Sequence, residues 1–549
     1  MVSHPIHKTG ADLLLSCLQA RGLSAVFGMP GNQNIALYDA LARTSPALPH
    51  YLVRHEQGAS MLASGYIRAS GRIAASVTVP GPGAANAATG VLDAYNDNIP
   101  LLSIVGGFER ICDKRDPSKL FHGLDQKAFY APFTRYFGSP KRLKEIPRIV
   151  NEAFAAMTGV RPGPAVIEIA PDVAAMHLPP GFHPAEPKQR PLALPVNPLE
   201  LGLAIESIRA LRRPVILVGS DVVAADAASL TQRLAELLGA PIIYGRRGKG
   251  VISDEHPQVA GFTRSKRTAA LLGAADGLIA IGSRFTQIDT KNWTLKLPEV
   301  VIQFDRDPKE VGREYPVTRG VSGDLTVALD AVLRELARTH FASDPEWRAS
   351  AESKHAQWRE LPPIPVLSEI RKALPKGGLI SVDVTATGYN CFDRFPVEDS
   401  RSLIYPCQSV SLGFGFPAAI GAKLACPDRP VVSLSGDGGF LMGAFELGPA
   451  VEHEVSVVAV VVKDNCLSAI NGSQRKEFNG RTIDTTMRSP DFVALARSFG
   501  AEATSTTDIA ELPQLIEAGL GRRGPTVIEL RMEDRIDEMI SVIPWLHGE

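Results

Sequence analysis

The feature that most constrains the fold of this chain is a repeated alternation of short apolar runs with longer segments of helical periodicity. The runs are rich in Val, Ile and Ala and end near Gly or Asp, so each has the character of a strand that is apolar on both faces. Such strands, alternating with helices, are typical of parallel sheets covered on both sides. The clearest runs lie at residues 75–79, 101–105, 164–169, 214–218, 277–281, 300–304, 379–382, 431–435, 456–462 and 525–530. The sequence therefore predicts an α/β protein that binds ligands at the carboxyl ends of its strands.

Two changes in composition divide the chain into domains. At 549 residues it is too long for a single hydrophobic core. Residues 178–198 are so rich in proline that neither a helix nor a central strand can persist, which predicts a semi-rigid linker. A weaker break is the polar, charged stretch at residues 339–365. We expect three doubly wound parallel-sheet domains, at residues 1–178, 199–340 and 366–549.

Charge and cysteine usage restrict the partners and the compartment. The chain has 58 Lys and Arg against 59 Asp and Glu, a balance that argues against a nucleic-acid or anionic-membrane partner and favours small molecules. Its six cysteines are scattered singly, without the close pairs of a zinc site or a disulfide framework. The most apolar short run, residues 457–462, is far too short to span a bilayer, and residues 1–10 lack the apolar stretch of a signal peptide. We expect a cytoplasmic protein.

The stretch from residue 431 to residue 470 carries the strongest chemical signal. It is interpreted as a strand at 431–435, a glycine turn, a helix at about 441–452 and a strand at 456–462. Because one helix joins the two strands, they are expected to be parallel, with their carboxyl ends on the same edge of the sheet. Asp437 and Asp464, which follow these strands, should therefore converge.

Glycines beside Asp437 complete this candidate site. Two oxygen ligands next to exposed backbone N–H groups at a helix start form a seat for magnesium and a diphosphate. The glycines that expose such groups are Gly436, Gly438 and Gly439. Taken separately, Gly-Asp-Gly is a common tight turn and Asp464 is a helix cap. Their joint placement favours the cofactor site.

This pattern resembles the diphosphate-magnesium motif of thiamine diphosphate-dependent enzymes, the acetolactate synthases in particular. The resemblance implies that the metal is held by Asp437, Asp464 and the backbone carbonyl of Cys466, with diphosphate oxygens as further ligands. Most members of the family carry Asn where Asp464 stands, whereas some catabolic acetolactate synthases carry Asp. The side chain of Cys466 is interpreted as a small filler.

The segment LGFGFPAAIGA, at residues 412–422, is similar to the acetolactate synthase segment in which an apolar residue precedes Gly-Phe-Gly. The resemblance implies that Leu412 wedges between the two rings of thiamine and that the Val410 carbonyl accepts a hydrogen bond from the aminopyrimidine. Without the family, Leu412 would be interpreted as a core residue.

In the amino-terminal third, Arg54-His55-Glu56-Gln57 matches the family's cofactor-activating glutamate. Taken alone, Glu56 would be a solvent-facing acid in the first turn of a helix. The resemblance implies instead that it hydrogen-bonds the pyrimidine ring, where a carboxylate buried among apolar groups, with its pKa raised, shifts the ring to its imino tautomer.

Two glycine-rich loops accompany Glu56. FGMPGN at residues 27–32 resembles the family's first strand–helix turn and contains Gly31. TVPGPGAANAATGVLDAYNDNIP at residues 78–100 resembles the pyrimidine-side loop, in which Asn86 would face the cofactor. In the family the cofactor lies between the amino-terminal domain of one subunit and the carboxyl-terminal domain of its partner, which implies a homodimer, often doubled to a homotetramer.

The sequence departs from the family on the substrate side. Phe121-His122-Gly123 stands where acetolactate synthases carry Phe-Gln-Glu, so His122 is a candidate catalytic residue with an open role, and a surface or core histidine is the alternative. No two histidines are adjacent, so the paired histidines of pyruvate decarboxylases are absent.

The central segment lacks two motifs of the anabolic acetolactate synthases. GSRFTQIDT lacks their Asp-Asp-Arg, and VAGFTRSK stands in place of Gly-Met-His-Gly, so FAD binding is not expected, although Arg284 could contact a nucleotide. Arg246, Arg247 and Lys249 form either a basic pocket or a solvated turn, and the turn is preferred.

The leading hypothesis is a thiamine diphosphate- and Mg²⁺-dependent enzyme that acts on 2-oxo acids by decarboxylation, carboligation or both. Within the same cofactor class, the alternative is an oxidase or acyl-coenzyme A lyase. The alternative of a different class is a non-catalytic relative that binds the cofactor, and the presence of Glu56 argues against it.

Overall fold

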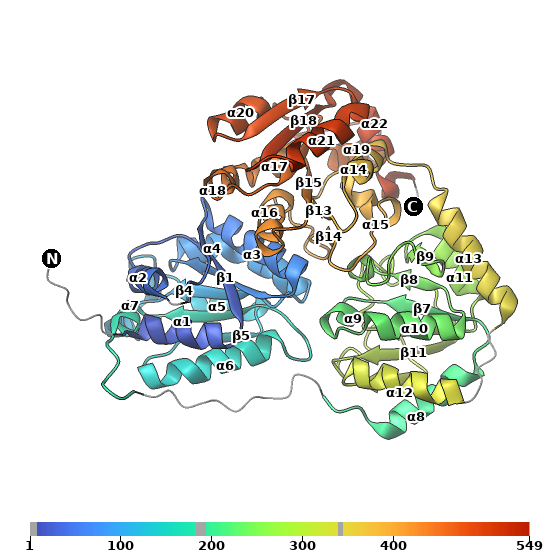
Figure 1. Ribbon diagram of the computed structural model, residues 1–549, viewed down its shortest axis with the longest axis horizontal. Coiled ribbons are helices and arrows are strands. Elements are labelled where there is room, and N and C mark those ends of the chain that lie inside the picture. The colour runs from blue at the N-terminus through green and yellow to red at the C-terminus, as the bar shows by residue number, and fades with distance from the viewer. Residues whose placement is uncertain (1–7, 45, 183–193, 339–343, 548–549) are drawn as a thin grey trace.

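The computed structural model describes residues 8–44, 46–182, 194–338 and 344–547. Within them lie three six-stranded sheets, and every strand pairing between neighbours is parallel. Figure 1 shows the three sheets in sequence order, the first in blue, the second in green and the third in orange and red, each flanked by helices. The predicted α/β fold of three parallel-sheet units is confirmed.

The first sheet has the strand order β2-β1-β3-β4-β6-β5. Its strands are β1 (Leu23–Gly28), β2 (His50–Leu52), β3 (Ile73–Thr78), β4 (Leu102–Gly106), β5 (Tyr136–Gly138) and β6 (Ala165–Ile169). Its helices are α1 (Gly10–Ala20), α2 (Ile35–Arg43), α3 (Glu56–Ser70), α4 (Pro82–Asn96), α5 (Gln126–Tyr130), α6 (Ile146–Met157) and α7 (Pro171–Ala175).

The second sheet has the order β12-β11-β10-β7-β8-β9, which reverses between β10 and β7. Its strands are β7 (Pro214–Val218), β8 (Ile242–Tyr244), β9 (Val259–Phe262), β10 (Gly277–Ile281), β11 (Val300–Asp305) and β12 (Arg319–Ser322). Its helices are α8 (Pro198–Ala210), α9 (Asp221–Ala224), α10 (Ala228–Leu238), α11 (Lys266–Ala274), α12 (Leu325–Arg338) and α13 (Pro345–Arg359).

The third sheet has the order β14-β13-β15-β16-β18-β17. Its strands are β13 (Leu379–Val382), β14 (Leu403–Ile404), β15 (Val431–Gly436), β16 (Val458–Lys463), β17 (Glu502–Thr506) and β18 (Thr526–Arg531). Its helices are α14 (Pro365–Ala373), α15 (Cys391–Arg394), α16 (Gly415–Ala425), α17 (Asp437–Leu441), α18 (Leu447–Glu452), α19 (Ser468–Glu477), α20 (Phe492–Ser498), α21 (Leu512–Leu520) and α22 (Ile536–Ser541).

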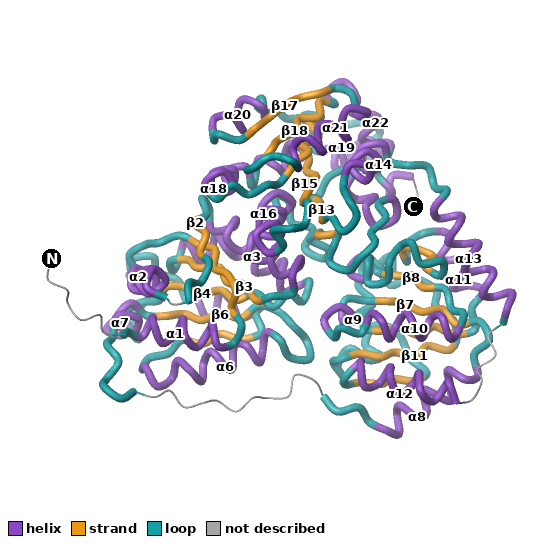
Figure 2. Tube along the Cα trace, viewed as in Figure 1, coloured by secondary structure: helices purple, strands orange, loops and turns teal. Residues whose placement is uncertain are grey.

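The first and third units share one hydrophobic core, which α3 and α16 join. Small residues let these helices touch: a Cβ added to Gly65 would lie 2.1 Å from the Ala418 carbonyl oxygen, and one added to Gly421 would lie 1.9 Å from that of Leu62. Figure 2 shows the two helices side by side where the units meet. This contact holds the start of α3, and thus Glu56, next to the third unit.

All ten predicted strands are present, and the runs at 214–218, 277–281 and 379–382 coincide with β7, β10 and β13. The helix expected at 441–452 is wrong as one element: α17 starts at Asp437, and α18 follows after a 3-10 turn at Ala444–Glu446. Pro449 has no N–H to donate within a continuous helix, so the helix is interrupted.

The polar break at residues 339–365 contains α13, capped by Asp344 and buried against the second unit through Trp347 and Trp358. Most of the proline-rich linker, residues 183–193, lies outside the described residues. In the described part of the chain, no helix is long and apolar enough to cross a membrane.

Candidate active site

Asp437 and Asp464 lie at the carboxyl ends of two neighbouring parallel strands. In the pairing of β15 with β16, Gly436 is opposite Val462, so the two aspartates follow at the same edge of the sheet. The residues are 2% and 6% exposed. Burial raises the pKa of Asp437, and burial together with the charge of Asp437 raises the pKa of Asp464 to about 6. The described residues place no cationic side chain within ion-pair distance of either carboxylate.

Hydrogen bonds fix both carboxylates in place. Asp437 accepts from the backbone N–H of Gly438 at 2.9 Å and of Asn465 at 2.8 Å, and from the Ser489 hydroxyl at 2.7 Å. Asp464 accepts from the Cys466 N–H at 3.0 Å and from the Ser468 hydroxyl. The two aspartates therefore lie close together as predicted, because Asn465, directly after Asp464, bonds the Asp437 carboxylate. Ser489, which reaches Asp437 from a loop 52 residues further along the chain, was not predicted from the sequence.

The carboxylates line a cavity of about 120 Å³. Its walls include most of the residues predicted for the diphosphate side, namely Leu412, Gly436, Asp437, Gly438, Gly439, Asp464 and Cys466. Gly438 and Gly439 lie in the first turn of α17, where backbone N–H groups have no partner within the helix. No described backbone or side-chain group donates a hydrogen bond to the Cys466 carbonyl oxygen.

This donor set fits magnesium with a diphosphate. Hard carboxylate and carbonyl oxygens are the ligands that Mg²⁺ prefers, and free amides at a helix start suit phosphate oxygens. Among the described residues, no group of three or more His, Cys, Asp or Glu side chains could hold a metal ion without further ligands. A metal here would therefore depend on diphosphate oxygens to complete its coordination.

The loop that carries Val410 and Leu412 is held by Asp383, at the carboxyl end of β13. Its carboxylate accepts the N–H groups of Gly413 and Gly415, both at 3.1 Å, and burial raises its pKa to about 6. Val410 has a φ of 50°, which is strained for a β-branched residue and is maintained only where the surroundings fix it. Leu412 is half-buried and lines the cavity, so it is not a plain core residue. Asp383 was not predicted as a site residue, although its position directly after a predicted strand is the same signal that Asp437 carries.

Glu56 is the first residue of α3, and His55 caps the helix. Asn86 Nδ2 donates to Glu56 Oε2 at 3.0 Å, and Glu56 is half-buried in this chain. A Cβ added to Gly31 would lie 2.4 Å from Val79 Cγ1, and one added to Gly83 would lie 3.3 Å from Glu56 Oε1. The two glycine loops thus gather around Glu56.

His122 lies beside the same loop. Its φ is 59°, its ring stacks on Phe121 with 3.9 Å between ring centroids, and its carbonyl oxygen would lie 2.3 Å from a Cβ added to Gly81. The buried Nδ1 atom has no hydrogen-bond partner within the described residues. His122 therefore accompanies Asn86 and Glu56 in the first unit.

The predicted residues form two groups in one chain. The residues that line the diphosphate cavity all lie between positions 384 and 470, so Glu56, Asn86 and His122 are not among them. Gln57 approaches that side, since a Cβ added to Gly413 would lie 3.6 Å from Gln57 Nε2. Large apolar side chains are exposed on segments next to both groups, at Phe121, Leu441, Met442, Ile470, Phe478 and Ile483.

The preferred interpretation of residues 246–249 as a solvated turn is wrong. Arg246 and Lys249 are each 7% exposed. Lys249 Nζ lies 2.6 Å from Asp254 Oδ2, and both side chains are completely buried. The third unit covers this turn, since Asp254 also accepts the Val397 N–H at 2.8 Å. A local polar sequence could not reveal that cover.

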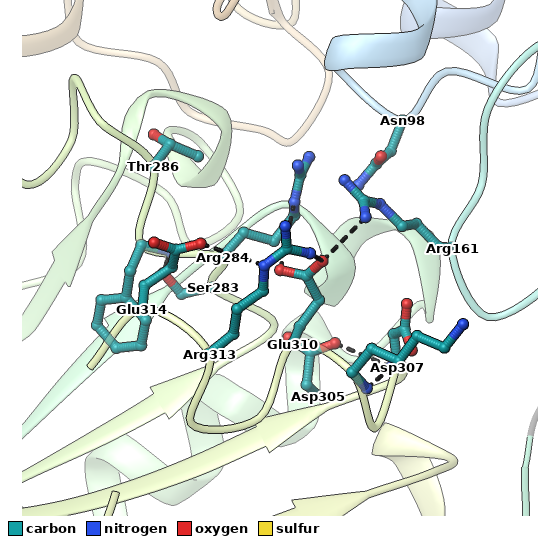
Figure 3. A network of polar contacts seen from close by, with 12 residues as sticks. Asn98, Arg161, Ser283, Arg284, Thr286, Asp305, Asp307, Glu310, Arg313 and Glu314 are labelled. Atoms are coloured by element: carbon teal, nitrogen blue, oxygen red, sulfur yellow. Dashed lines mark hydrogen bonds and ion pairs between the residues drawn. The ribbon is translucent and has the colours of Figure 1, made fainter. Parts of the chain in front are cut away.

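Arg284 belongs to a cluster around Glu310, shown in Figure 3. Glu310 pairs with Arg161 at 3.0 Å, with Arg313 at 3.3 Å and with Arg284 at 3.9 Å. Arg284 also donates to the Asn96 carbonyl at 3.2 Å, and burial lowers its pKa. The cluster connects the first unit to the second. Arg284 already has partners within the protein, namely Glu310 and the Asn96 carbonyl.

Comparison with known proteins covers almost the whole chain. Models of the thiamine pyrophosphate enzymes match residues 8–129 as the N-terminal TPP binding domain, 201–333 as the central domain and 385–530 as the C-terminal TPP binding domain. A probable 2-ketoarginine decarboxylase of Pseudomonas aeruginosa is 32% identical, covering 95% of this chain and 94% of the relative. A probable acetolactate synthase large subunit of Methanocaldococcus jannaschii is 30% identical, covering 97% and 93%. An acetolactate synthase of Bacillus subtilis is 27% identical, covering 99% and 97%.

Proposed function

This chain belongs to the thiamine pyrophosphate enzymes, of the acetolactate synthase and decarboxylase type, and from that premise we propose that it uses thiamine diphosphate with Mg²⁺ to decarboxylate a 2-oxo acid. The carbon that loses carbon dioxide then takes up a proton or forms a bond to an acceptor carbonyl, which gives the product. The observation that carries the proposal is the buried pair of Asp437 and Asp464 beside the glycines that open α17.

On the diphosphate side, Asp437, Asp464 and the Cys466 carbonyl hold the metal, and the amides of Gly438 and Gly439 bond phosphate oxygens. Gly436, which has no side chain, lets the diphosphate approach the backbone closely. When bound, thiamine diphosphate supplies a ring that takes up the electrons released as carbon dioxide leaves. These residues contribute position and charge rather than bond-making.

On the thiamine side, Leu412 would pack against the rings of the cofactor, and the Val410 carbonyl would accept a hydrogen bond from the aminopyrimidine. The strained φ of Val410 supports this role, because such backbone strain clusters at ligand-binding positions. Asp383 keeps the loop in this conformation through its bonds to Gly413 and Gly415.

Glu56 is the proton partner of the pyrimidine ring, with Gly31 and Asn86 as its neighbours. The Asn86 amide bonds Oε2, which orients the carboxyl and leaves Oε1 for the ring nitrogen. A carboxyl that shares a proton with the ring promotes the imino tautomer. His122, beside the same loop, is assigned to the substrate side.

We infer a homodimer or homotetramer with each active site between two subunits. The separation of Glu56 from the cavity walls within one chain supports this arrangement. Exposed apolar side chains such as Met442 and Ile470, beside the cavity, would then be covered by a partner subunit. The balanced charge and unpaired cysteines favour a cytoplasmic location.

The names of the relatives leave the substrate open between a 2-oxo acid with a guanidinium tail and small 2-oxo acids that undergo carboligation. An oxidase or an acyl-coenzyme A lyase is the runner-up. A non-catalytic role is disfavoured by the Asn86–Glu56 bond, which a cofactor-binding relic has no need to retain. FAD is not part of the proposal.

The test is a panel of 2-oxo acids supplied to the purified protein with thiamine diphosphate and Mg²⁺, followed by product identification. Carbon dioxide release from one or more of them, abolished in Glu56→Gln, is the expected result. Cofactor binding without release from any 2-oxo acid would overturn the assigned activity.

A further inference from the structure

A cavity of about 520 Å³ lies between the second and third units, next to the candidate active site. Tyr389 lines both this cavity and the diphosphate cavity, and Val410, from the loop assigned to the aminopyrimidine, lines the larger one. We call it the interdomain cavity. Its position makes it the space into which the far end of a substrate would extend.

The wall of the interdomain cavity carries a strong excess of positive charge. Its charged lining residues are Arg246, Arg264, Lys266, Arg267, Arg394 and Asp393. Asp393, the one carboxylate among these lining residues, is already paired with two of the cations, Arg267 at 2.9 Å and Arg394 at 3.7 Å. The remaining cations face the cavity without an acid from its wall to balance them.

Arg246 and Arg264 provide the unsatisfied donors. Arg246 is 7% exposed, and its buried Nε and Nη2 atoms have no hydrogen-bond partner in the described structure. Asp289, which does not line the cavity, forms a long ion pair with Arg246, with 3.4 Å between Nε and Oδ1, and its other oxygen accepts from Thr286. Nη2 is left without a partner. A buried guanidinium whose donors are unpaired is costly, so this arrangement favours a bound oxygen ligand.

Arg264 is a second arginine on the wall of the interdomain cavity that has unpaired donors. Among the described residues it forms no hydrogen bond or ion pair, and its buried Nε is unpartnered. Burial and the charge of Arg246 lower the pKa of Arg264, and the charge of Asp289 opposes this shift only in part. A carboxylate between them would accept from both.

The rest of the wall is largely apolar or aromatic, including Phe262, Ile288, Leu361 and Trp545. Such a wall suits a short hydrocarbon segment between two polar ends. The same arginines would repel a substrate with a positively charged tail.

We propose that the interdomain cavity binds a carboxylate at the far end of the substrate, which makes the substrate a 2-oxo dicarboxylic acid. Arg246 and Arg264 bind the distal carboxylate, while the 2-oxo acid end meets the cofactor. This inference rests on the proposed function, because it names the substrate class of the same site.

The test compares substrates that differ only in the charge of the far end. The holoenzyme is supplied with 2-oxoglutarate or its 5-methyl ester, and kcat/KM is measured for each. One or two charge-assisted hydrogen bonds predict a preference of about tenfold to a hundredfold for the diacid. A 2-oxo acid that ends in a phosphonate shows whether the cavity selects a carboxylate or any oxyanion of that length.

Variants assign the preference to the two arginines. Arg264→Gln and Arg246→Gln should each lower kcat/KM for the diacid about tenfold or more and leave the ester nearly unchanged. Arg264→Lys should restore part of the preference. Lys266→Gln is the matched control, because Lys266 is an exposed cation on the same wall and its loss should change the ratio less than about threefold.

A binding measurement separates this inference from the proposed function. Glutarate, which has no oxo group, is titrated calorimetrically into the cofactor-loaded parent and into Arg264→Gln, with butyrate as the control. Glutarate binding that Arg264→Gln weakens supports the cavity assignment even if no 2-oxo acid reacts, an outcome in which the proposed function alone fails. Equal turnover of diacid and ester, with no binding of glutarate, would overturn the assignment while leaving the proposed function intact.

Discussion

We expect Glu446 to make the stability of this protein depend on pH, and Glu446→Gln to remove that contribution. Glu446 is 0% exposed, and its Oε1 atom accepts the backbone N–H groups of Arg54 at 3.3 Å and His55 at 3.2 Å, just before α3 begins at Glu56. Gly58 makes room for it, since an added Cβ would lie 1.9 Å from Oε1. Burial raises the pKa of Glu446 from 4.5 to about 8.

A folded-state pKa above the unfolded value means that the folded protein binds the proton more tightly. The contribution of Glu446 to stability is therefore fully present below pH 4.5 and is lost as the pH rises through about 8. At 1.36 kcal/mol per pH unit, the full difference is about 5 kcal/mol. Glutamine resembles the protonated side chain, keeps the Oε1 acceptor and does not titrate.

Denaturant unfolding at pH 5, 7 and 9 tests this reasoning. We expect the parent to lose several kcal/mol between pH 5 and 9 relative to Glu446→Gln, with the variant the more stable of the two at pH 9. Glu452→Gln is the control, because Glu452 is a half-exposed carboxylate paired with Arg54 and should leave the profile unchanged. Parallel pH profiles for the parent and Glu446→Gln would refute the argument.

Three further predictions concern the active site and the buried charges. Asp437→Ala should abolish Mg²⁺-dependent binding of thiamine diphosphate, measured by calorimetric titration, and undiminished affinity would contradict the metal site. Glu56→Gln should leave cofactor affinity nearly unchanged but slow turnover about a hundredfold or more, and quenched proton NMR of hydrogen–deuterium exchange at the cofactor C2 should show the same loss. Asp254→Ala should lower the free energy of unfolding by about 3–5 kcal/mol because it leaves Lys249 buried without its partner. The double variant Asp254→Leu, Lys249→Met should have a free energy of unfolding closer to that of the parent. A small effect of Asp254→Ala in denaturant unfolding would contradict the assigned buried ion pair.

The sequence could predict those features that depend on local pattern. Central strands such as β10 and β15 are buried on both faces, so their apolar runs are continuous. The edge strands β2 and β14 are three and two residues long, too short to show a period, and were not predicted. The pair of Asp437 and Asp464 could be placed because strand order within a βαβ unit fixes which ends meet.

Contacts between distant segments could not be predicted in this way. Glu446 meets Arg54 across 392 residues of sequence, and no local pattern marks a glutamate that ends in a core rather than in solvent. The same reason explains the error at Arg246 and Lys249, which look like a polar turn until the third unit covers them. These charges are buried because the units pack against one another, and the periodicity of a single segment carries no information about that packing.

Several residues around the proposed site adopt a conformation or a burial that their side chains disfavour. Val410 adopts a left-handed φ that its branched side chain resists, and Asp437 and Asp464 bring like charges together out of water. Arg246 is buried with donors unpaired. A chain selected for stability alone would place glycine, asparagine and leucine at such positions, because each change relieves strain or desolvation. Features that oppose folding are expected where a ligand compensates them, so these positions agree with the proposals of a diphosphate and metal at one end of the site and a carboxylate at the other.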